Sequence, residues 1–457
     1  MKLPKATKFA FGFGAFGKDL VYMLVANYVL YYYNAVLGVS SVFIGAVLMG
    51  ARVFDAINDP IMGIVVAKTN TRFGRFRPWV LTGTVLNAVT IYALFAAPEA
   101  GESSLRIWLA VVYILWGITY TMMDIPFWSM IPAITEPGSE RESLSSFARS
   151  CAGIGDAIPM VATMVVVPIL AGSSVIADYK IGFRWWGLII AVVFVVSEFV
   201  FCKVVDEKKP EEMETVGIGQ MFKSLFKNDQ AMTAVVAVIM VYLALNIVGN
   251  LVLYFFQFDV GNTDAYSVFV AGCFLAQVVA MFSIPAMRKK IDKMKLFRYA
   301  ILIQIAGFVV LLLVAYSGIY KSVSWLVLMI PGVLVYMGYG VLTVMLTIFL
   351  ADSVDYGELK NGSREESVIF SMQTFTVKLA AGVGVFIAGI AIDMVGLDPQ
   401  AATQTEGALD GLCIFMTIPS ALILVAAYLV FIKYYKLNDA KMEEILAELK
   451  TKNREEQ

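Results

Sequence analysis

The chain has 457 residues, of which 59% are hydrophobic and 16% charged, and its mean hydropathy is +0.76. Soluble domains have about 45–50% apolar and about 25% charged residues, so this composition predicts a polytopic membrane protein. The formal net charge of −1 provides no basic field for nucleic acid. The sequence has no histidine, which excludes histidine-based catalytic triads and proton relays.

Twelve apolar stretches are long enough to cross a bilayer, which takes about 20 helical residues. Basic residues gather at the junctions after even-numbered spans, so the positive-inside rule predicts that both termini are cytoplasmic. Lys2, Lys5 and Lys8 precede the first span and no small-residue cleavage site follows, so we do not expect a signal peptide. The expected spans are 9–37, 41–67, 79–99, 105–131, 147–172, 183–205, 231–257, 263–287, 296–318, 323–351, 367–395 and 408–434.

A polar interruption at 206–230 divides these spans into six and six. Basic runs follow the second span of each half, at 72–77 and 288–298, which indicates a weak internal repeat. Two such halves predict an all-α major facilitator fold, with its site between the halves. The expected parts are an N-terminal half at 1–205, a cytoplasmic linker at 206–230, a C-terminal half at 231–434 and a cytoplasmic tail at 435–457.

Ionisable residues inside the spans are candidates for function, because burying a charge in lipid costs several kcal/mol. The alternative is that they form structural ion pairs between helices. In chain order, the candidates are Lys18 and Asp19 in the first span, Arg52, Asp55 and Asp59 in the second, Asp124 in the fourth, Arg149 and Asp156 in the fifth, and Lys378 in the eleventh.

The second span carries two acids four residues apart, Asp55 and Asp59, which share one face of a helix. Their mutual repulsion indicates that a bound cation compensates them. Carboxylate, hydroxyl and amide oxygens suit a hard monovalent ion, and Asn58, Thr121 and Asp124 provide further ones. We expect Na⁺, while Li⁺ or a proton remains an alternative.

The fourth span presents a polar and aromatic stripe on one face, because its members are three or four residues apart. An acid, a hydroxyl and two aromatic rings suit a sugar, whose hydroxyls bind charged groups and whose C–H surface stacks on a ring. Asp19 and Arg149 are further candidates. Ordinary interhelical packing is the alternative. The stripe consists of Gly117, Tyr120, Thr121, Asp124 and Trp128.

Three motifs carry a resemblance that covers essentially the whole chain. They are DAINDPIMG with TRFGRFRPW at the second span, TYTMMDIPFWSMIPAIT at the fourth, and ADSVDYGELK after the tenth. In these strings the chain resembles the glycoside–pentoside–hexuronide:cation symporter family, and within it the sodium-coupled melibiose carriers. The resemblance implies a major facilitator fold and cation-coupled sugar symport in the bacterial cytoplasmic (inner) membrane.

The family's site residues map onto this chain by the same motifs. The resemblance implies a cation site at Asp55, Asn58, Asp59 and Thr121, with Asp124 beside it. It implies sugar contacts at Lys18, Asp19, Tyr120, Asp124, Trp128 and Arg149 in the first half, and at Gln373, Thr374 and Lys378 in the second. It implies a cytoplasmic gate of Arg141, Glu142, Asp352, Asp355, Glu358 and Arg364.

One departure from the family affects substrate choice. The melibiose carriers have a tryptophan in the tenth span, whereas 339–349 contains none. The sugar pocket is therefore expected to be altered on its C-terminal side, and melibiose itself is not assumed as the substrate. The family still implies a melibiose-like galactoside or another oligosaccharide. We expect no enzyme activity, no cofactor beyond the coupling ion, and a monomer. Two alternatives remain: a lipid or amphiphile carrier on the same fold, and a membrane enzyme or sensor without transport.

Overall fold

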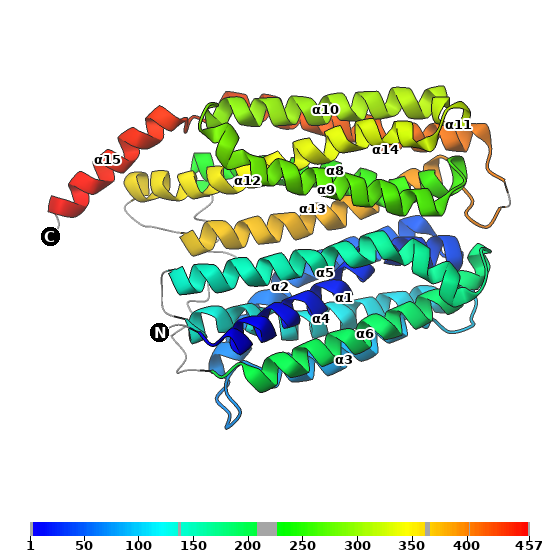
Figure 1. Cartoon of the computed structure of the whole chain (residues 1–457), viewed down its shortest axis with the longest axis horizontal. Helices are drawn as coiled ribbons and strands as arrows, with labels where there is room; N and C mark the ends of the chain where they lie inside the picture. Colours follow the sequence, from blue (N-terminus) through cyan, green and yellow to red (C-terminus); the bar gives the residue numbers. More distant parts are fainter. Residues whose placement is uncertain (1–2, 136–138, 208–225, 362–365, 402, 456–457) are drawn as a thin grey trace. The chain divides into compact units, whose positions relative to one another are not determined.

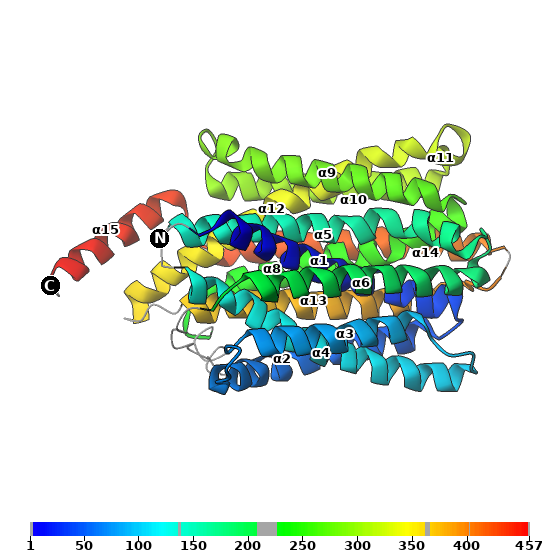
Figure 2. The ribbon, with the colours of Figure 1, turned by 60° about the horizontal axis from the view of Figure 1, so that its bottom comes forward.

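The computed structural model describes residues 3–135, 139–207, 226–361, 366–401 and 403–455. These residues form helices without a β-strand, and twelve of the helices are long and apolar enough to cross a membrane. The predicted all-α class and the twelve spans are thereby confirmed for the described part of the chain. Figures 1 and 2 show the helices of each unit running side by side.

The chain divides into two compact units. The first consists of the described residues up to 207 with 398–401, and the second of the other described residues from 226 on. The first contains α1 (Lys5–Tyr31), η1 (Tyr32–Val36), α2 (Ser41–Lys68), α3 (Arg77–Phe95), α4 (Glu102–Ile134), α5 (Ser139–Ala171), η2 (Ile176–Asp178) and α6 (Tyr179–Val204). The second contains α8 (Asp229–Tyr254), η3 (Phe255–Asp259), α9 (Thr263–Arg288), α10 (Lys293–Ser317), α11 (Ile319–Ser322), η4 (Trp325–Leu328), α12 (Met329–Asn361), α13 (Glu366–Met394), α14 (Glu406–Tyr434) and α15 (Asp439–Glu455).

Several of these helices have a polar N-cap residue just before their first turn. Asn228 caps α8, and its side chain accepts a hydrogen bond from the backbone of Ala231 at 3.0 Å. Asn262 and Asp292 cap α9 and α10 in the same way. Such side chains satisfy amide N–H groups that have no partner within the helix. The helix starts are therefore encoded locally.

The helices of the two units pack in the same pattern. In the first unit α1 packs on α5 and α6, α3 on α4 and α6, and α2 on α4. In the second unit α8 packs on α13 and α14, α10 on α12 and α14, and α9 on α12. The first helix of each unit also ends in a π-helical turn, η1 and η3. The weak sequence repeat thus corresponds to a structural repeat.

The outward faces of the helices are apolar. Phe282 on α9 is 82% exposed and Ile169 on α5 is 72% exposed, although both lie in spans. In water such side chains would be buried, whereas in a bilayer they contact lipid. The interior is held by close helix contacts. A side chain at Gly155 of α5 would collide with the carbonyl of Phe16 on α1.

Candidate functional site

A buried amine lies at the centre of the predicted sugar-contacting set in the first unit. Lys18 on α1 is 3% exposed. Its Nζ lies 2.7 Å from Oδ1 of Asp19 on the same helix and 2.7 Å from Oδ1 of Asp124 on α4. The two carboxylates offset the cost of burying the ammonium group. The structure therefore brings three predicted sugar residues from two helices into one charge cluster.

Aromatic residues of α4 enclose this cluster. The indole N–H of Trp128 donates to Oδ1 of Asp124 at 3.1 Å, and the hydroxyl of Tyr120 donates to Oδ1 of Asp19 at 3.4 Å. Lys18 Nζ lies 4.9 Å from the centre of the Trp128 ring, a cation–π distance. The predicted stripe of the fourth span thus places rings directly beside carboxylates, the chemistry that suits a sugar.

The guanidinium group of Arg149 on α5 lies over the Trp128 ring, with Cζ 3.9 Å from the ring centre. Apart from this contact, the Arg149 side chain is exposed. Asp156, two turns further along α5, interacts electrostatically with Asp19. Helices α1, α4 and α5 therefore all contribute charged groups to the same region.

The predicted cation residues are distributed over α2 and α4. The hydroxyl of Thr121 donates to Oδ1 of Asp59 at 2.9 Å. Asp55 lies on the same face of α2 and is 5% exposed. A Cβ at Gly117 of α4 would lie 3.3 Å from Oδ1 of Asp55, so the small residue leaves room for this carboxylate. The amide nitrogen of Asn58 is buried without a hydrogen-bond partner among the described residues.

Asp55 has a cationic partner on its own helix. Nη1 of Arg52 lies 3.1 Å from Oδ2 of Asp55, and Nη2 donates to the hydroxyl of Tyr113 on α4 at 3.4 Å. For Asp55, the structure therefore shows the alternative stated above, an ion pair within the protein. The described residues contain no group of three or more His, Cys, Asp or Glu side chains suited to a metal ion. A cation site here would draw on hydroxyl and amide oxygens as well.

The predicted sugar residues of the second unit lie on α13. The side-chain amide of Gln373 donates to the hydroxyl of Thr347 on α12 at 3.2 Å. Thr374 is exposed and Lys378 is half-buried, and each has a further interaction. These three residues therefore share one helix segment of the C-terminal half.

The predicted gate residues are partly described. Asp352 on α12 forms an ion pair with Lys293 on α10 of its own unit, with 2.5 Å between Oδ2 and Nζ. Asp355 and Glu358 are half-buried on α12. The side chains of Arg141 and Glu142, and the whole of Arg364, lie outside the described residues.

One acid near this site is not among the residues predicted from the sequence. Glu198 on α6 is 0% exposed, and both its carboxylate oxygens lack a hydrogen-bond partner among the described residues. It interacts electrostatically with Lys18 and Asp124. The signal was available, because Glu198 is an acid in the middle of the predicted span 183–205.

Comparisons with known proteins match this chain to sugar transport proteins. The family model described as "MFS/sugar transport protein" matches residues 10–439. The "Raffinose carrier protein" of Pediococcus pentosaceus is 28% identical over 459 residues, covering 96% of this chain and 70% of the relative. The "Uncharacterized symporter YnaJ" of Bacillus subtilis (strain 168) is 26% identical over 465 residues, covering 99% and 96%.

Solved structures support the fold. The crystal structure of nucleoside transporter NupG superposes with a TM-score of 0.67 at 14% identity, covering 93% of this chain and 99% of that one. At this identity the likeness concerns the fold alone. Together with the twelve apolar helices, it confirms the predicted major facilitator fold and a multi-pass membrane protein.

Proposed function

Since the chain belongs to the MFS/sugar transport protein family, we propose that it carries a sugar or glycoside across the membrane with a monovalent cation, by alternating access. Family membership also confirms the resemblance at the level of the sugar symporter family. The family and its relatives are transporters rather than enzymes.

The observation that carries the proposal is the double role of α4. Thr121 bonds to Asp59 of α2, while Asp124, one turn further along α4, pairs with Lys18 of α1. One rigid helix therefore joins the predicted cation set to the predicted sugar set. A change at Asp59 reaches Asp124 through a single turn of helix, which is a short route for energetic coupling.

The cation step follows from the chemistry of the oxygens. In the proposed site, Na⁺ binds the carboxylates of Asp55 and Asp59 with the oxygens of Asn58 and Thr121. The Thr121 hydroxyl donates a hydrogen bond to Asp59, so the lone pairs of the Thr121 oxygen remain available to a cation. Li⁺ would use the same oxygens, whereas a proton would need only one carboxylate.

The sugar step uses groups that are paired with one another in this structure. Sugar hydroxyls replace Lys18 as partners of Asp19 and Asp124, and Lys18 then donates to the sugar. Arg149 covers one face of Trp128, so a sugar ring that stacks on that face displaces the guanidinium group. Arg149 is then free to donate to a hydroxyl. In the second unit, the resemblance implies sugar contacts at Gln373, Thr374 and Lys378.

Coupling requires that the cation raise the affinity for sugar, and such effects are typically about 1–3 kcal/mol. The relatives include a raffinose carrier, which favours an oligosaccharide such as a galactoside as substrate. A lipid or amphiphile carrier is the second candidate, but the buried charges around Lys18 favour a polar substrate. A sensor without transport would bind sugar and move none.

Uptake into proteoliposomes tests the proposal. Labelled raffinose, melibiose, lactose and a labelled lipid are each offered under an inward gradient of Na⁺, Li⁺ or H⁺, and with no gradient. We expect at least one glycoside to accumulate under a cation gradient, and the lipid not to move. Transport of lipid alone would support the second candidate. Absence of sugar accumulation under every gradient would rule out symport of these sugars.

A further inference from the structure

In the first unit, Glu207, which follows α6, binds the loop between α2 and α3. The carboxylate of Glu207 accepts hydrogen bonds from three successive backbone amides, those of Arg75 (2.6 Å), Phe76 (2.9 Å) and Arg77 (2.8 Å). These amides lie at the start of α3, where N–H groups lack intrahelical partners and the helix dipole favours an anion. Glu207 thus occupies a nest of backbone amides.

The loop sequence is adapted to this carboxylate. Gly74 has a φ of +104°, a conformation that favours glycine, and a Cβ at this position would collide with the carboxylate of Glu207. Arg77 then donates from Nε to the carbonyl of Val205 at 2.7 Å. The end of α6 and the start of α3 are therefore connected in two ways. The Glu207 carboxylate binds backbone amides at the start of α3, and the Arg77 side chain binds the carbonyl of Val205 after α6.

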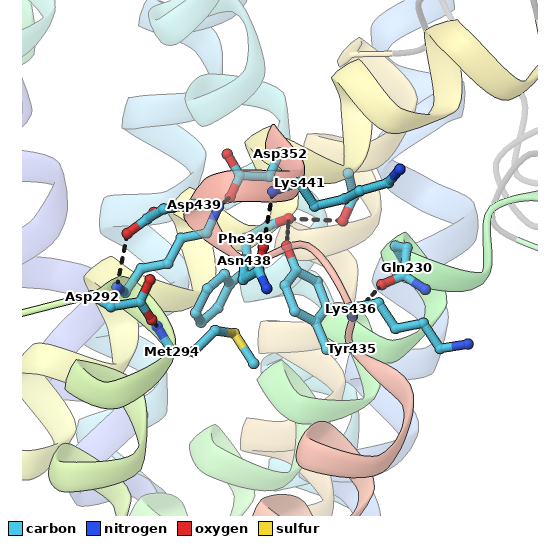
Figure 3. A network of polar contacts seen from close by, with 12 residues as sticks. Gln230, Asp292, Met294, Phe349, Asp352, Tyr435, Lys436, Asn438, Asp439 and Lys441 are labelled. Carbon is cyan, nitrogen blue, oxygen red and sulfur yellow. Dashed lines mark hydrogen bonds and ion pairs between the residues drawn. The ribbon is translucent and has the colours of Figure 1, made fainter. Parts of the chain in front are cut away.

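The second unit has an acid in the corresponding place, shown in Figure 3. Asp439 is the first residue of α15, just after α14. Arg288 at the end of α9 donates two hydrogen bonds to its carboxylate, from Nη1 to Oδ2 at 3.1 Å and from Nη2 to Oδ1 at 2.9 Å. The backbone amide of Lys293, the first residue of α10, donates to Oδ2 at 3.4 Å. Asp439 therefore joins α9 and α10 to the tail.

Further bonds extend this attachment to α12 and α8. Lys293 is 3% exposed, and its Nζ lies 2.5 Å from Asp352 of α12 and 3.8 Å from Asp439. The hydroxyl of Tyr435 donates to the carbonyl of Phe349 at 2.9 Å, and Figure 3 shows this bond beside the ion pairs. The amide of Lys436 donates to Oε1 of Gln230 at 2.7 Å. The segment after α14 is thus bound to four other helices of its unit, α8, α9, α10 and α12.

The two arrangements are equivalent within the repeat. Helices α2, α3 and α6 of the first unit correspond in packing to α9, α10 and α14 of the second. In each unit an acid that follows the last span binds the start of the third. The partners differ, because Glu207 binds backbone amides whereas Asp439 binds mainly a guanidinium group. The two acids occupy equivalent positions but bind different groups. This indicates that the connection between the last and third spans is the common feature, rather than one particular kind of bond.

We propose that Glu207 and Asp439 are equivalent positioning residues for transport. Each ties the exit of the last span in its half to the start of the third span, so that the half moves as one body during alternating access. Without the tie, the ends of these helices slide past one another, and motion at the site is not transmitted to the cytoplasmic end. This inference rests on the proposed function.

Hydrogen exchange tests the attachment separately from transport. In Glu207→Gln, we expect faster exchange of the amides at 75–77, and in Asp439→Asn faster exchange at 288–293 and in α15. Asp206→Asn is the matched control in the first unit, because Asp206 is 91% exposed in its pair with Arg77. Glu444→Gln is the control in the second, at a side chain 55% exposed on α15. Unchanged exchange in both test variants would overturn the inference.

Transport then tests the role. We expect the maximal uptake rate to fall about tenfold in each test variant, a change of about 1.4 kcal/mol in the barrier, while sugar affinity stays within about twofold of the parent. Asp439→Glu keeps the charge and should recover part of the rate. A parent rate in variants whose exchange is faster would overturn the positioning role. If the parent itself moves no sugar, the proposed function fails, whereas loss confined to the variants concerns this inference alone.

Discussion

The hydroxyl of Thr121 on α4 donates a hydrogen bond to Asp59 on α2, with 2.9 Å between Oγ1 and Oδ1. This bond ties Asp59 directly to the helix that carries several of the predicted sugar residues. Asp55, one turn away, has Arg52 as its cationic partner. The two acids of the second span therefore have different bonded partners, Thr121 for Asp59 and Arg52 for Asp55. Asp59 is the better position for a mutation that tests the link to α4.

The first prediction concerns Asp59. In Asp59→Cys, we expect cation-stimulated sugar accumulation to disappear while some downhill sugar movement persists, because the predicted sugar residues around Lys18 are untouched. The measurement is uptake into vesicles with and without a Na⁺ gradient. Asp178→Cys, at an exposed acid before α6, is the control. Accumulation by Asp59→Cys equal to that of the parent would contradict the proposed cation role.

The second prediction concerns Trp128. Its ring lies under Arg149 and beside Lys18, and its N–H bonds to Asp124. In Trp128→Ala we expect sugar affinity to fall about tenfold, since an aromatic contact and a hydrogen bond to a charged group are both lost. Calorimetric titration with sugar measures this. Trp185→Ala, at a ring 50% exposed on α6, should bind as the parent does, and equal affinities in the two variants would refute the assignment.

The third prediction concerns the acid that sequence analysis missed. Burial without hydrogen bonds disfavours the charged form of a carboxyl group, and a neutral amide of nearly the same shape fills the same space without a charge. We therefore expect Glu198→Gln to unfold at the same temperature as the parent or higher. Glu198→Ala should unfold at a lower temperature because it leaves a cavity. Thermal melting in detergent separates them, and equal destabilisation by Gln and Ala would instead mean that the charge itself is required.

The fourth prediction concerns pH at the tail. Burial is the largest single influence on Asp439 and would raise its pKa. The hydrogen bonds and charge of Arg288, the contact with Asp292 and the backbone amide of Lys293 together outweigh burial and lower the pKa below the usual value. A lowered pKa means that the attachment of α15 is fully present above the unfolded pKa of about 3.9 and is lost as the pH falls through the folded value. We expect protection of α15 amides to be constant from neutral pH down to about 5 and to drop at more acidic pH.

Asp439→Asn provides the control for that measurement. This variant cannot titrate at position 439, so protection of its tail amides should be lower than in the parent at neutral pH. It should also lack the step at acidic pH. An acidic step of the same size in the variant would assign the transition to another group. The side chain of Asp439 is 38% exposed, so added salt should reduce the neutral-pH difference.

Much of the fold could be predicted from local features. Length and hydropathy predict the spans, and residues such as Asn228 and Asp292 mark helix starts through their own side chains. Helical periodicity places Thr121, Asp124 and Trp128 on successive turns of one helix. These inferences succeed because each depends on neighbours within a few residues, which the sequence shows directly.

The partners of the charged residues could not be predicted in this way. Lys18 selects Asp124 from another helix, and Glu207 binds amides at the start of α3 from beyond the end of α6. Nothing near Glu207 in the chain distinguishes it from other acids of the polar interruption at 206–230. Its role exists only once α3 and α6 are packed together.

The sequence by itself determined the class of this protein, its twelve spans and its family, because the bilayer demands about 20 apolar helical residues per crossing and the motif strings are long. Only the tertiary structure decided how each buried charge is compensated. Arg52 pairs with Asp55, Lys18 bridges Asp19 and Asp124, and Glu198 is left without a hydrogen-bond partner among the described residues. The physical reason is that compensation depends on distances of a few ångströms between helices, which helix packing sets.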